Sequence, residues 1–232
     1  MKINVHATSI ETLRSLTNAF IETIKTCKSK PFHLALPGGS FAQMLFKFWT
    51  KNYRDRIPWE IIHFYWIDEQ CVSPESEESN FKHAEQLLFR PLQISQDHVH
   101  RIWGEKDPNI EAERYSEIVK WELPGYSDTP RFDCIILNIE SDGHVASIFN
   151  SSMNLLTDQR VYAVSQHPQN KQMRITMTGT VILKSTSLLI SIIGAEKQTI
   201  MKHLVHKKGI YPASYILNHA TTAILFTDQR VE

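Results

Sequence analysis

The strongest constraint on the fold is an alternation of short apolar runs with helical patterns over most of the chain. Residues 32–36 (FHLAL) form an apolar run of strand length, and apolar side chains from Phe41 to Trp49 then recur at the spacing of one helix face. Residues 134–139 (CIILNI) are apolar almost throughout, as expected of a strand covered on both sides of a parallel sheet. The alternation predicts an α/β fold, a doubly wound, mostly parallel sheet with helices on both faces, of the Rossmann-like kind.

The other expected elements continue the same pattern. The predicted elements are strands over residues 61–67, 99–103, 187–193 and 222–226 and helices over residues 80–89, 109–121 and 195–205. A first helix begins at Thr8, where Glu11 completes a capping box. Its buried face is predicted to comprise Ile10, Leu13, Leu16, Phe20, Ile24 and Cys27. Residues 124–130 form a loop too short to be a linker, so we expect residues 1–232 to form a single domain.

Composition excludes several classes of function. The formal net charge is zero, which gives no basic surface for nucleic acid, and the longest apolar run, residues 188–193, is too short to cross a membrane. The 3 cysteines are odd in number and far apart, which is typical of a reducing compartment, and we expect a cytoplasmic protein. The 11 histidines are scattered without metal-ligand spacing, so no metal site is predicted.

Candidate site residues follow the predicted strands, because ligands bind at the carboxyl ends of strands in doubly wound sheets. The first group is Pro37-Gly38-Gly39-Ser40, at the start of a predicted helix. Its glycines permit a sharp turn, and unpaired N–H groups at a helix start attract anions. Ser40 either contributes a hydroxyl to a phosphate or caps the helix together with Gln43, and the two interpretations are compatible.

Two further groups carry ionisable side chains. Asp68 and Glu69 end the strand predicted at residues 61–67, where carboxylates serve as bases or accept hydrogen bonds from sugar hydroxyls. The alternative is a solvated turn. His144 follows the strand at residues 134–139, with Asp142 two residues before it, and histidine is suited to general-base chemistry near neutral pH. The alternative for His144 is a hydrogen-bonded loop residue.

Three cations lie beside predicted helix starts, where a phosphate is already favoured. These are Arg174, together with Lys171 in the same sequence NKQMRIT, and Lys197, within GAEK. Each would be read as ordinary surface charge if it stood alone.

Taken in order, these segments resemble the 6-phosphogluconolactonase family, within the larger group that includes glucosamine-6-phosphate deaminase. Residues 37–40 (PGGS) resemble the phosphate-binding loop of the family, and residues 67–69 (IDE) resemble its acidic strand end. Residues 142–149 (DGHVASIF) resemble the signature D-G-H-T-A-S-L-F, which is the most specific match. Residues 174–176 (RIT) and 194–197 (GAEK) fit two later segments of the family.

The resemblance implies hydrolysis of 6-phospho-D-glucono-1,5-lactone to 6-phosphogluconate, a step of the oxidative pentose phosphate pathway. His144 would be the general base, with Asp142 and Asp68 orienting the imidazole or the sugar hydroxyls, and N–H groups of the 142–144 turn near the oxyanion. The residues implied in substrate or phosphate binding are Gly38, Gly39, Ser40, Glu69, Gly143, Arg174 and Lys197. No metal or organic cofactor is implied, the partner is the small phosphosugar lactone alone, and a monomer and a dimer are both open.

The sequence also departs from the family pattern at two places. Gln70 stands where the family has arginine, and Asn138-Ile139-Glu140 replaces a glycine-rich segment. A sugar-phosphate-binding protein without turnover is therefore one alternative function. A second is a glucosamine-6-phosphate deaminase or isomerase, but that branch continues from D-G-H to A-F-N-E-P, whereas this chain reads ASIFN at residues 146–150.

Overall fold

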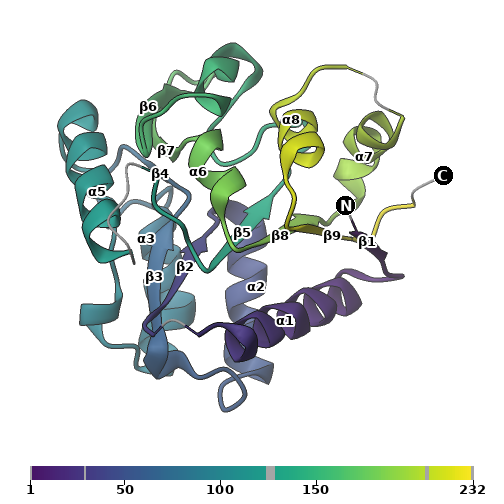
Figure 1. The fold of residues 1–232 in the computed structure, drawn as a ribbon, viewed down its shortest axis with the longest axis horizontal. Helices are drawn as coiled ribbons and strands as arrows, with labels where there is room; N and C mark the ends of the chain where they lie inside the picture. The colour runs from purple at the N-terminus through teal and green to yellow at the C-terminus, as the bar shows by residue number, and fades with distance from the viewer. Residues whose placement is uncertain (1, 29, 124–128, 207–208, 231–232) are drawn as a thin grey trace.

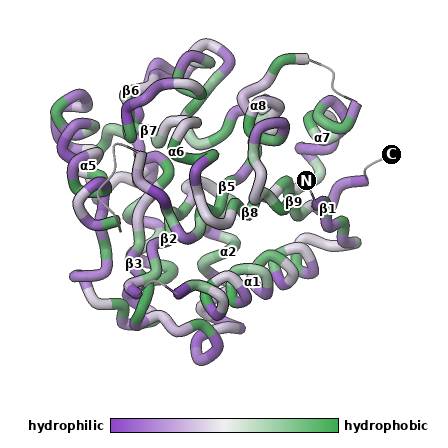
Figure 2. Tube along the Cα trace, viewed as in Figure 1, coloured by the Kyte–Doolittle hydropathy of each residue, from purple (hydrophilic) through white to green (hydrophobic). Residues whose placement is uncertain are grey.

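A six-stranded parallel sheet is the centre of the fold in the computed structural model, which describes residues 2–28, 30–123, 129–206 and 209–230 (Figure 1). Its strands, in spatial order, are β1 (Lys2–Val5), β9 (Ala223–Thr227), β8 (Ser187–Ile192), β5 (Cys134–Asn138), β2 (Phe32–Leu36) and β3 (Ile62–Trp66). Every residue of β2 and β5 is buried, which explains why these runs are apolar without alternation (Figure 2). The predicted α/β sheet is confirmed.

Helices cover both faces of this sheet. In Figure 1, α1 (Ser9–Thr26) and α2 (Gly39–Asn52) lie below the strands, and α7 (Gln198–Val205) and α8 (Pro212–His219) lie above them. The remaining α-helices are α3 (Asn80–Ala84), α4 (Arg90–Leu92), α5 (Pro108–Glu122) and α6 (Gly179–Lys184). A π-helical turn, η2 (Glu85–Phe89), joins α3 to α4. The short 3₁₀ turns are η1 (Trp59–Ile61), η3 (Gln96–His98), η4 (Asn150–Leu156) and η5 (Ala195–Lys197).

Helix α1 confirms the predicted start but not the whole predicted face. The Thr8 hydroxyl oxygen accepts a hydrogen bond from the Glu11 N–H at 3.2 Å. The predicted residues Leu13, Leu16, Phe20 and Ile24 are buried. Ile10, however, is 59 % exposed. Ile10 lies about 60° around the helix axis from Leu13, at the border of the buried face. In the first turn of the helix, this border faces solvent.

A second, three-stranded antiparallel sheet was not expected from the sequence. It consists of β4 (Asp68–Gln70), β7 (Met173–Met177) and β6 (Tyr162–Gln166), and α5 packs beside it. Ile67 joins the two sheets, since its N–H donates to Leu36 O at 2.9 Å and its carbonyl accepts from Met177 N at 2.7 Å. Arg174 therefore lies in a strand and not beside a helix start.

Two other predictions need correction or lie beyond what is described. Residues 99–103 do not form a strand, because Val99 makes only an isolated bridge to Phe64 before the chain turns away. Of the predicted loop at residues 124–130, residues 124–128 lie outside the described part of the chain. In the described ranges, no helix combines the length and the apolar character that crossing a membrane requires.

Candidate active site

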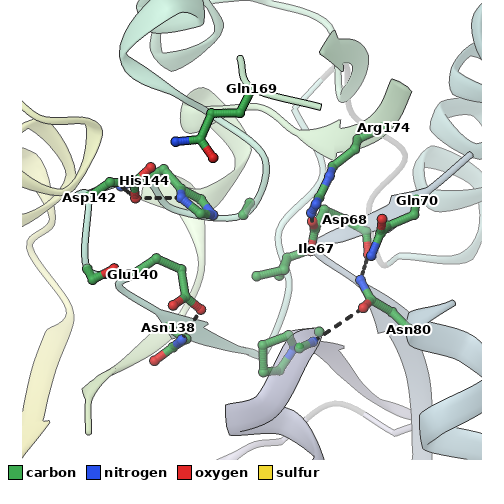
Figure 3. Close-up of a pocket in the computed structure, with 15 residues that line it drawn as sticks. Ile67, Asp68, Gln70, Asn80, Asn138, Glu140, Asp142, His144, Gln169 and Arg174 are labelled. Atoms are coloured by element: carbon green, nitrogen blue, oxygen red, sulfur yellow. Dashed lines mark hydrogen bonds and ion pairs between the residues drawn. The ribbon is translucent and has the colours of Figure 1, made fainter. Parts of the chain in front are cut away.

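A cavity of about 400 Å³ lies at the carboxyl ends of β2, β3 and β5, where the fold class predicts a ligand (Figure 3). Side chains from both sheets meet in it. The lining residues are Pro37, Gly38, Gly39, Ile67, Asp68, Gln70, Asn80, Asn138, Glu140, Ser141, Asp142, His144, Ala146, Gln169 and Arg174. Six of the predicted site residues are thus brought together, namely Gly38, Gly39, Asp68, Asp142, His144 and Arg174.

His144 forms a hydrogen-bonded pair with Asp142 at the edge of this cavity. His144 Nδ1 lies 2.7 Å from Asp142 Oδ1, and the imidazole packs beside the Phe149 ring at a centroid distance of 4.7 Å. The hydrogen bond from His144 holds the pKa of Asp142 down at about 2, so this carboxyl is ionised near neutral pH. A carboxylate at Nδ1 favours the tautomer with its proton on Nδ1, and the Nε2 lone pair is then left for a proton from the cavity.

The shape of the turn that carries His144 depends on the backbone conformation of Gly143 and on a contact with the start of α8. Gly143 adopts a positive φ of 83°, and a Cβ at this position would lie 2.5 Å from the Tyr211 ring. The Gly143 carbonyl accepts a hydrogen bond from Ala213 N at 3.0 Å, at the start of α8. Gly143 was predicted as a binding residue but does not itself line the cavity. It instead allows the tight turn that places His144 there.

Two of the three N–H groups in the 142–144 turn have acceptors within the turn, and the predicted oxyanion role stays a prediction. The Gly143 N–H donates to Glu140 O at 2.9 Å, and the His144 N–H donates to Asp142 Oδ1 at 3.2 Å. Both donors are therefore occupied within the turn itself.

Asp68 is a buried carboxylate held between the two sheets. It is 4 % exposed, accepts a hydrogen bond from the Ser147 hydroxyl at 2.6 Å and lies 3.7 Å from Arg174 Nη1. Burial raises its pKa, whereas the charge of Arg174 and the Ser147 hydrogen bond act in the opposite direction. Asp68 makes no hydrogen bond with His144. Among the described residues, Asp142 is the carboxylate that is hydrogen-bonded to the His144 imidazole.

Among the described residues, Arg174 is the arginine that lines the cavity. It projects from β7 towards Asp68, and its guanidinium lies 6.0 Å from the centre of the Phe149 ring (Figure 3). Its Nε is buried and has no hydrogen-bond partner among the described atoms. The pairing with Asp68 is loose, so the guanidinium retains donors for an anionic ligand.

Glu69 belongs to the framework and not to the cavity wall. Its Oε1 accepts from Gln70 N and Asn80 N, each at 2.8 Å, and its Oε2 accepts from Phe81 N at 2.8 Å and the Ser79 hydroxyl at 3.2 Å. Burial raises its pKa to about 7, although the three backbone donors favour the carboxylate. Three of these donors belong to residues 79–81 at the start of α3 and the fourth to Gln70, and the predicted contact of Glu69 with a substrate stays a prediction.

The glycine loop places backbone rather than the Ser40 side chain at the cavity. The N-cap of α2 is Gly38, so the predicted Ser40 cap is wrong, and Ser40 is exposed within the first turn. Gly39 has a φ of 72°, and its N–H donates to Asn80 Oδ1 at 3.3 Å. A Cβ at Gly38 would lie 2.1 Å from the Asn80 side chain, so a larger residue there would force that side chain to move.

Lys197 lies behind the cavity wall and contacts two residues that line it. Its Nζ is 3.1 Å from Asn138 Oδ1 and 3.2 Å from Glu140 Oε2, and Lys197 is 4 % exposed. Asn138 Nδ2 in turn donates to Glu140 Oε1 at 2.5 Å, and Ser191 donates to Asn138 Oδ1 at 3.0 Å. Lys197 thus compensates the charge of Glu140, and its predicted contact with phosphate stays a prediction.

Sequence reasoning missed three residues of this site. Ser147 was quoted only as part of a motif, and its contact with Asp68 joins segments distant in sequence. Asn138 and Gln169 line the cavity, the latter from the exposed turn between β6 and β7. Gln169 carries no sequence signal, because neither of the strands that position it was predicted.

The parallel sheet and the cavity at its strand ends define an α/β protein with a ligand site where that class places one, and comparison with known families identifies the family. The chain belongs to the family described as glucosamine-6-phosphate isomerases/6-phosphogluconolactonase, whose model matches residues 7–225. It is similar to the 6-phosphogluconolactonase of Treponema pallidum (strain Nichols), with 34 % identity over 186 residues, covering 80 % of this chain and 76 % of the relative.

Two further comparisons point the same way. The 6-phosphogluconolactonase of Haemophilus influenzae is 35 % identical over 175 residues, covering 75 % of this chain and 73 % of the relative. The crystal structure of the devB protein superposes with a TM-score of 0.88 at 31 % identity, covering 98 % of this chain and 95 % of that one.

Proposed function

We propose that this protein hydrolyses 6-phospho-D-glucono-1,5-lactone to 6-phosphogluconate, as in the oxidative pentose phosphate pathway. The observation that carries the proposal is the His144–Asp142 pair at 2.7 Å, at the edge of a cavity that also contains an arginine and a glycine loop. The similarity to proteins named 6-phosphogluconolactonase supports the choice of substrate.

In the proposed mechanism, His144 Nε2 takes a proton from a water molecule whose oxygen attacks the lactone carbonyl carbon. The bond between that carbon and the ring oxygen then breaks, and the imidazolium returns the proton to the departing oxygen. Asp142 holds the imidazole and stabilises its protonated form, in the way that carboxylates support catalytic histidines elsewhere. The mechanism uses neither a metal nor an organic cofactor.

Substrate recognition is assigned to the opposite wall. Arg174 and the backbone at Gly38 offer donors to the phosphate, which fixes the lactone relative to the attacking water. The neighbouring Gly39 N–H is already bonded to Asn80 Oδ1. Glu140 and Gln70 offer polar groups to the sugar hydroxyls. The pairing of Glu140 with Lys197 reduces the repulsion that an uncompensated carboxylate would exert on a phosphate ester.

The test is the rate at which freshly prepared lactone disappears in the presence of the purified protein, corrected for uncatalysed hydrolysis. We expect His144→Ala to lower kcat by roughly 10²–10⁴-fold, the usual contribution of general acid–base catalysis. His219→Ala, an exposed histidine on α8, is the matched control and should leave the rate unchanged. A wild-type rate equal to background would refute the proposal.

The same preparation separates the alternatives. Ammonia release from glucosamine 6-phosphate would indicate the deaminase reaction. Saturable binding of 6-phosphogluconate without turnover of the lactone would indicate a binding protein.

A further inference from the structure

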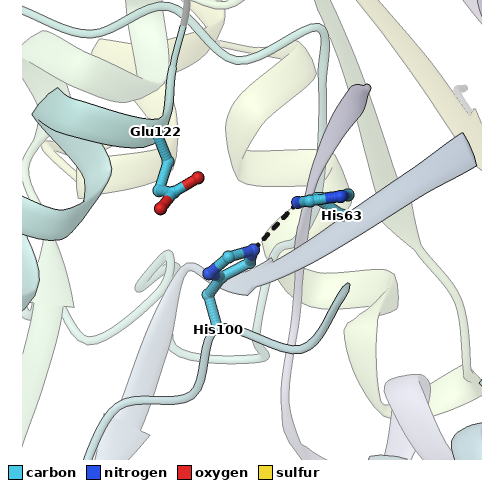
Figure 4. A group of neighbouring side chains, drawn as sticks. All are labelled: His63, His100 and Glu122. Carbon is cyan, nitrogen blue, oxygen red and sulfur yellow. Dashed lines mark hydrogen bonds between the residues drawn. The ribbon is translucent and has the colours of Figure 1, made fainter. Parts of the chain in front are cut away.

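A group of histidines lies at the opposite end of the sheet from the cavity. His33 and His63 are register partners on β2 and β3, each the second residue of its strand, and their ring centroids are 6.1 Å apart. His98 stacks on His63 at 4.7 Å, and His100 lies beside it, with His63 Nδ1 3.0 Å from His100 Nε2 (Figure 4). Glu122, the last residue of α5, completes the group with an exposed carboxylate.

The donor atoms of three of these residues converge. One atom each from His63, His100 and Glu122 lies within 4.8 Å of the other two, and Figure 4 shows a nitrogen of each imidazole directed at the other ring, with the Glu122 carboxylate beside them. Two nitrogens that bind one tetrahedral metal at about 2.0–2.1 Å are separated by about 3.3 Å. The 3.0 Å separation of the two ring nitrogens is close to that requirement.

Each of the two imidazoles can direct a lone pair at the same point. A neutral ring carries its single proton on either nitrogen. His63 protonated on Nε2 and His100 protonated on Nδ1 would present two lone pairs to a common point.

A second observation shows that the polar groups here are incompletely satisfied. Asp133 Oδ2 lies 3.1 Å from His33 Nδ1, which leaves His33 Nε2 as a buried atom without a partner among the described residues. Tyr65, whose ring stacks on His100 at 4.5 Å, has a buried hydroxyl that is also unpaired in the described part of the chain. Buried polar groups are almost always satisfied, and an ion or its bound water is one way to satisfy them.

We propose that His63, His100 and Glu122 bind a divalent transition-metal ion of the zinc type. Two imidazoles and one carboxylate suit Zn²⁺ and similar ions, whereas Mg²⁺ prefers a shell of oxygen ligands. The site lies at the amino ends of β2 and β3, away from His144, so the ion would fasten the end of α5 to β3 and stabilise the fold without entering the reaction. Sequence spacing cannot reveal this site, because its ligands come from three separate segments.

The test is a titration of the metal-free full-length protein with Zn²⁺, followed by calorimetry and by thermal unfolding, with Mg²⁺ in a parallel series. We expect one Zn²⁺ per chain, a rise in Tm with Zn²⁺ alone, and at least about a tenfold loss of affinity in Glu122→Gln and in His100→Gln. Glu113→Gln, exposed on the same helix, and His144→Gln, in the cavity, should both bind Zn²⁺ as the wild type does.

Two outcomes would overturn the proposal. One is the absence of stoichiometric Zn²⁺ binding. The other is unchanged affinity in Glu122→Gln, which changes an exposed side chain at a helix end and is therefore expected to fold. Circular dichroism of each variant without metal shows whether a loss of Zn²⁺ binding is caused by misfolding. If His100→Gln does not fold, the result for Glu122→Gln decides the test.

Discussion

Lys197 Nζ lies 3.2 Å from Glu140 Oε2, and this ion pair sits in the wall of the cavity where an anionic substrate is proposed to bind. The lysine side chain is 5 % exposed and the glutamate side chain 35 % exposed. Removing one member of such a pair leaves the other charge uncompensated in a partly desolvated place.

We expect Lys197→Met to raise KM for the lactone about tenfold, because the free Glu140 carboxylate would then repel the phosphate ester. The double variant Lys197→Met/Glu140→Gln should recover most of that loss. If Lys197 contacted the phosphate directly, the double variant would remain as weak as the single one. Steady-state kinetics of the four members of this cycle decide between the two roles, with Lys184→Met on the surface as a control.

Asp142 provides a prediction about the orientation of the His144 imidazole. Its pKa of about 2 keeps it ionised across the pH range of an assay, so it holds His144 Nδ1 as a carboxylate. In Asp142→Asn an amide replaces this carboxylate, so kcat at neutral pH should fall by up to about 10⁴-fold. Asp158→Asn, which changes a carboxylate paired with Arg160, is expected to leave kcat unaltered.

Arg174 should act on binding of the phosphate and not on the chemical step. We expect Arg174→Gln to raise KM for the phosphorylated lactone at least about tenfold, since a charge-assisted pair is replaced by neutral hydrogen bonding. Turnover of unphosphorylated gluconolactone should change little, because that substrate has no group for Arg174 to bind. Arg160→Gln, an exposed arginine on the neighbouring surface, serves as the control. An equal loss on both lactones would contradict the assignment.

Glu69 should matter for stability more than for substrate binding. In Glu69→Gln an amide N–H₂ replaces one carboxylate oxygen and faces backbone donors, so at least one buried N–H group loses its acceptor. Each such loss costs about 1–3 kcal/mol, which should appear in the free energy of unfolding measured by urea denaturation. Glu113→Gln should not change it. A variant as stable as the wild type, but with a raised KM, would instead support the contact with substrate predicted from sequence.

Sequence reasoning located the main sheet and the His144 turn because both depend on local signals. The runs at residues 32–36 and 134–139 become β2 and β5, and Gly143 marks a tight turn with positive φ. The second sheet escaped prediction because β4 is 3 residues long and β6 and β7 are partly exposed, which obscures any simple apolar pattern.

The roles of individual side chains were harder to predict than their positions. Glu69 follows Asp68 directly, and nothing in the sequence distinguishes the carboxylate that lines the cavity from the one that holds α3. Alternation along β4 separates them, since neighbouring residues of a strand point to opposite faces. Lys197 and Glu140 are far apart in sequence, so their pairing becomes visible only in the folded chain.

The pairing of β1 with β9 has a consequence for how the chain reaches this structure. Lys2 is in register with Ile224, and Val5 with Thr227, so the earliest strand of the sheet is joined to the last one made. During synthesis, the edge of β8 that pairs with β9 stays open until β9 has been made. For the same reason, β1 cannot pair with β9 until the ribosome has passed residue 227. Such long-range pairing carries a large loop-closure entropy and slows folding. Completion of this edge is therefore expected to be a late event in biosynthesis, after the strands around His144 have been made.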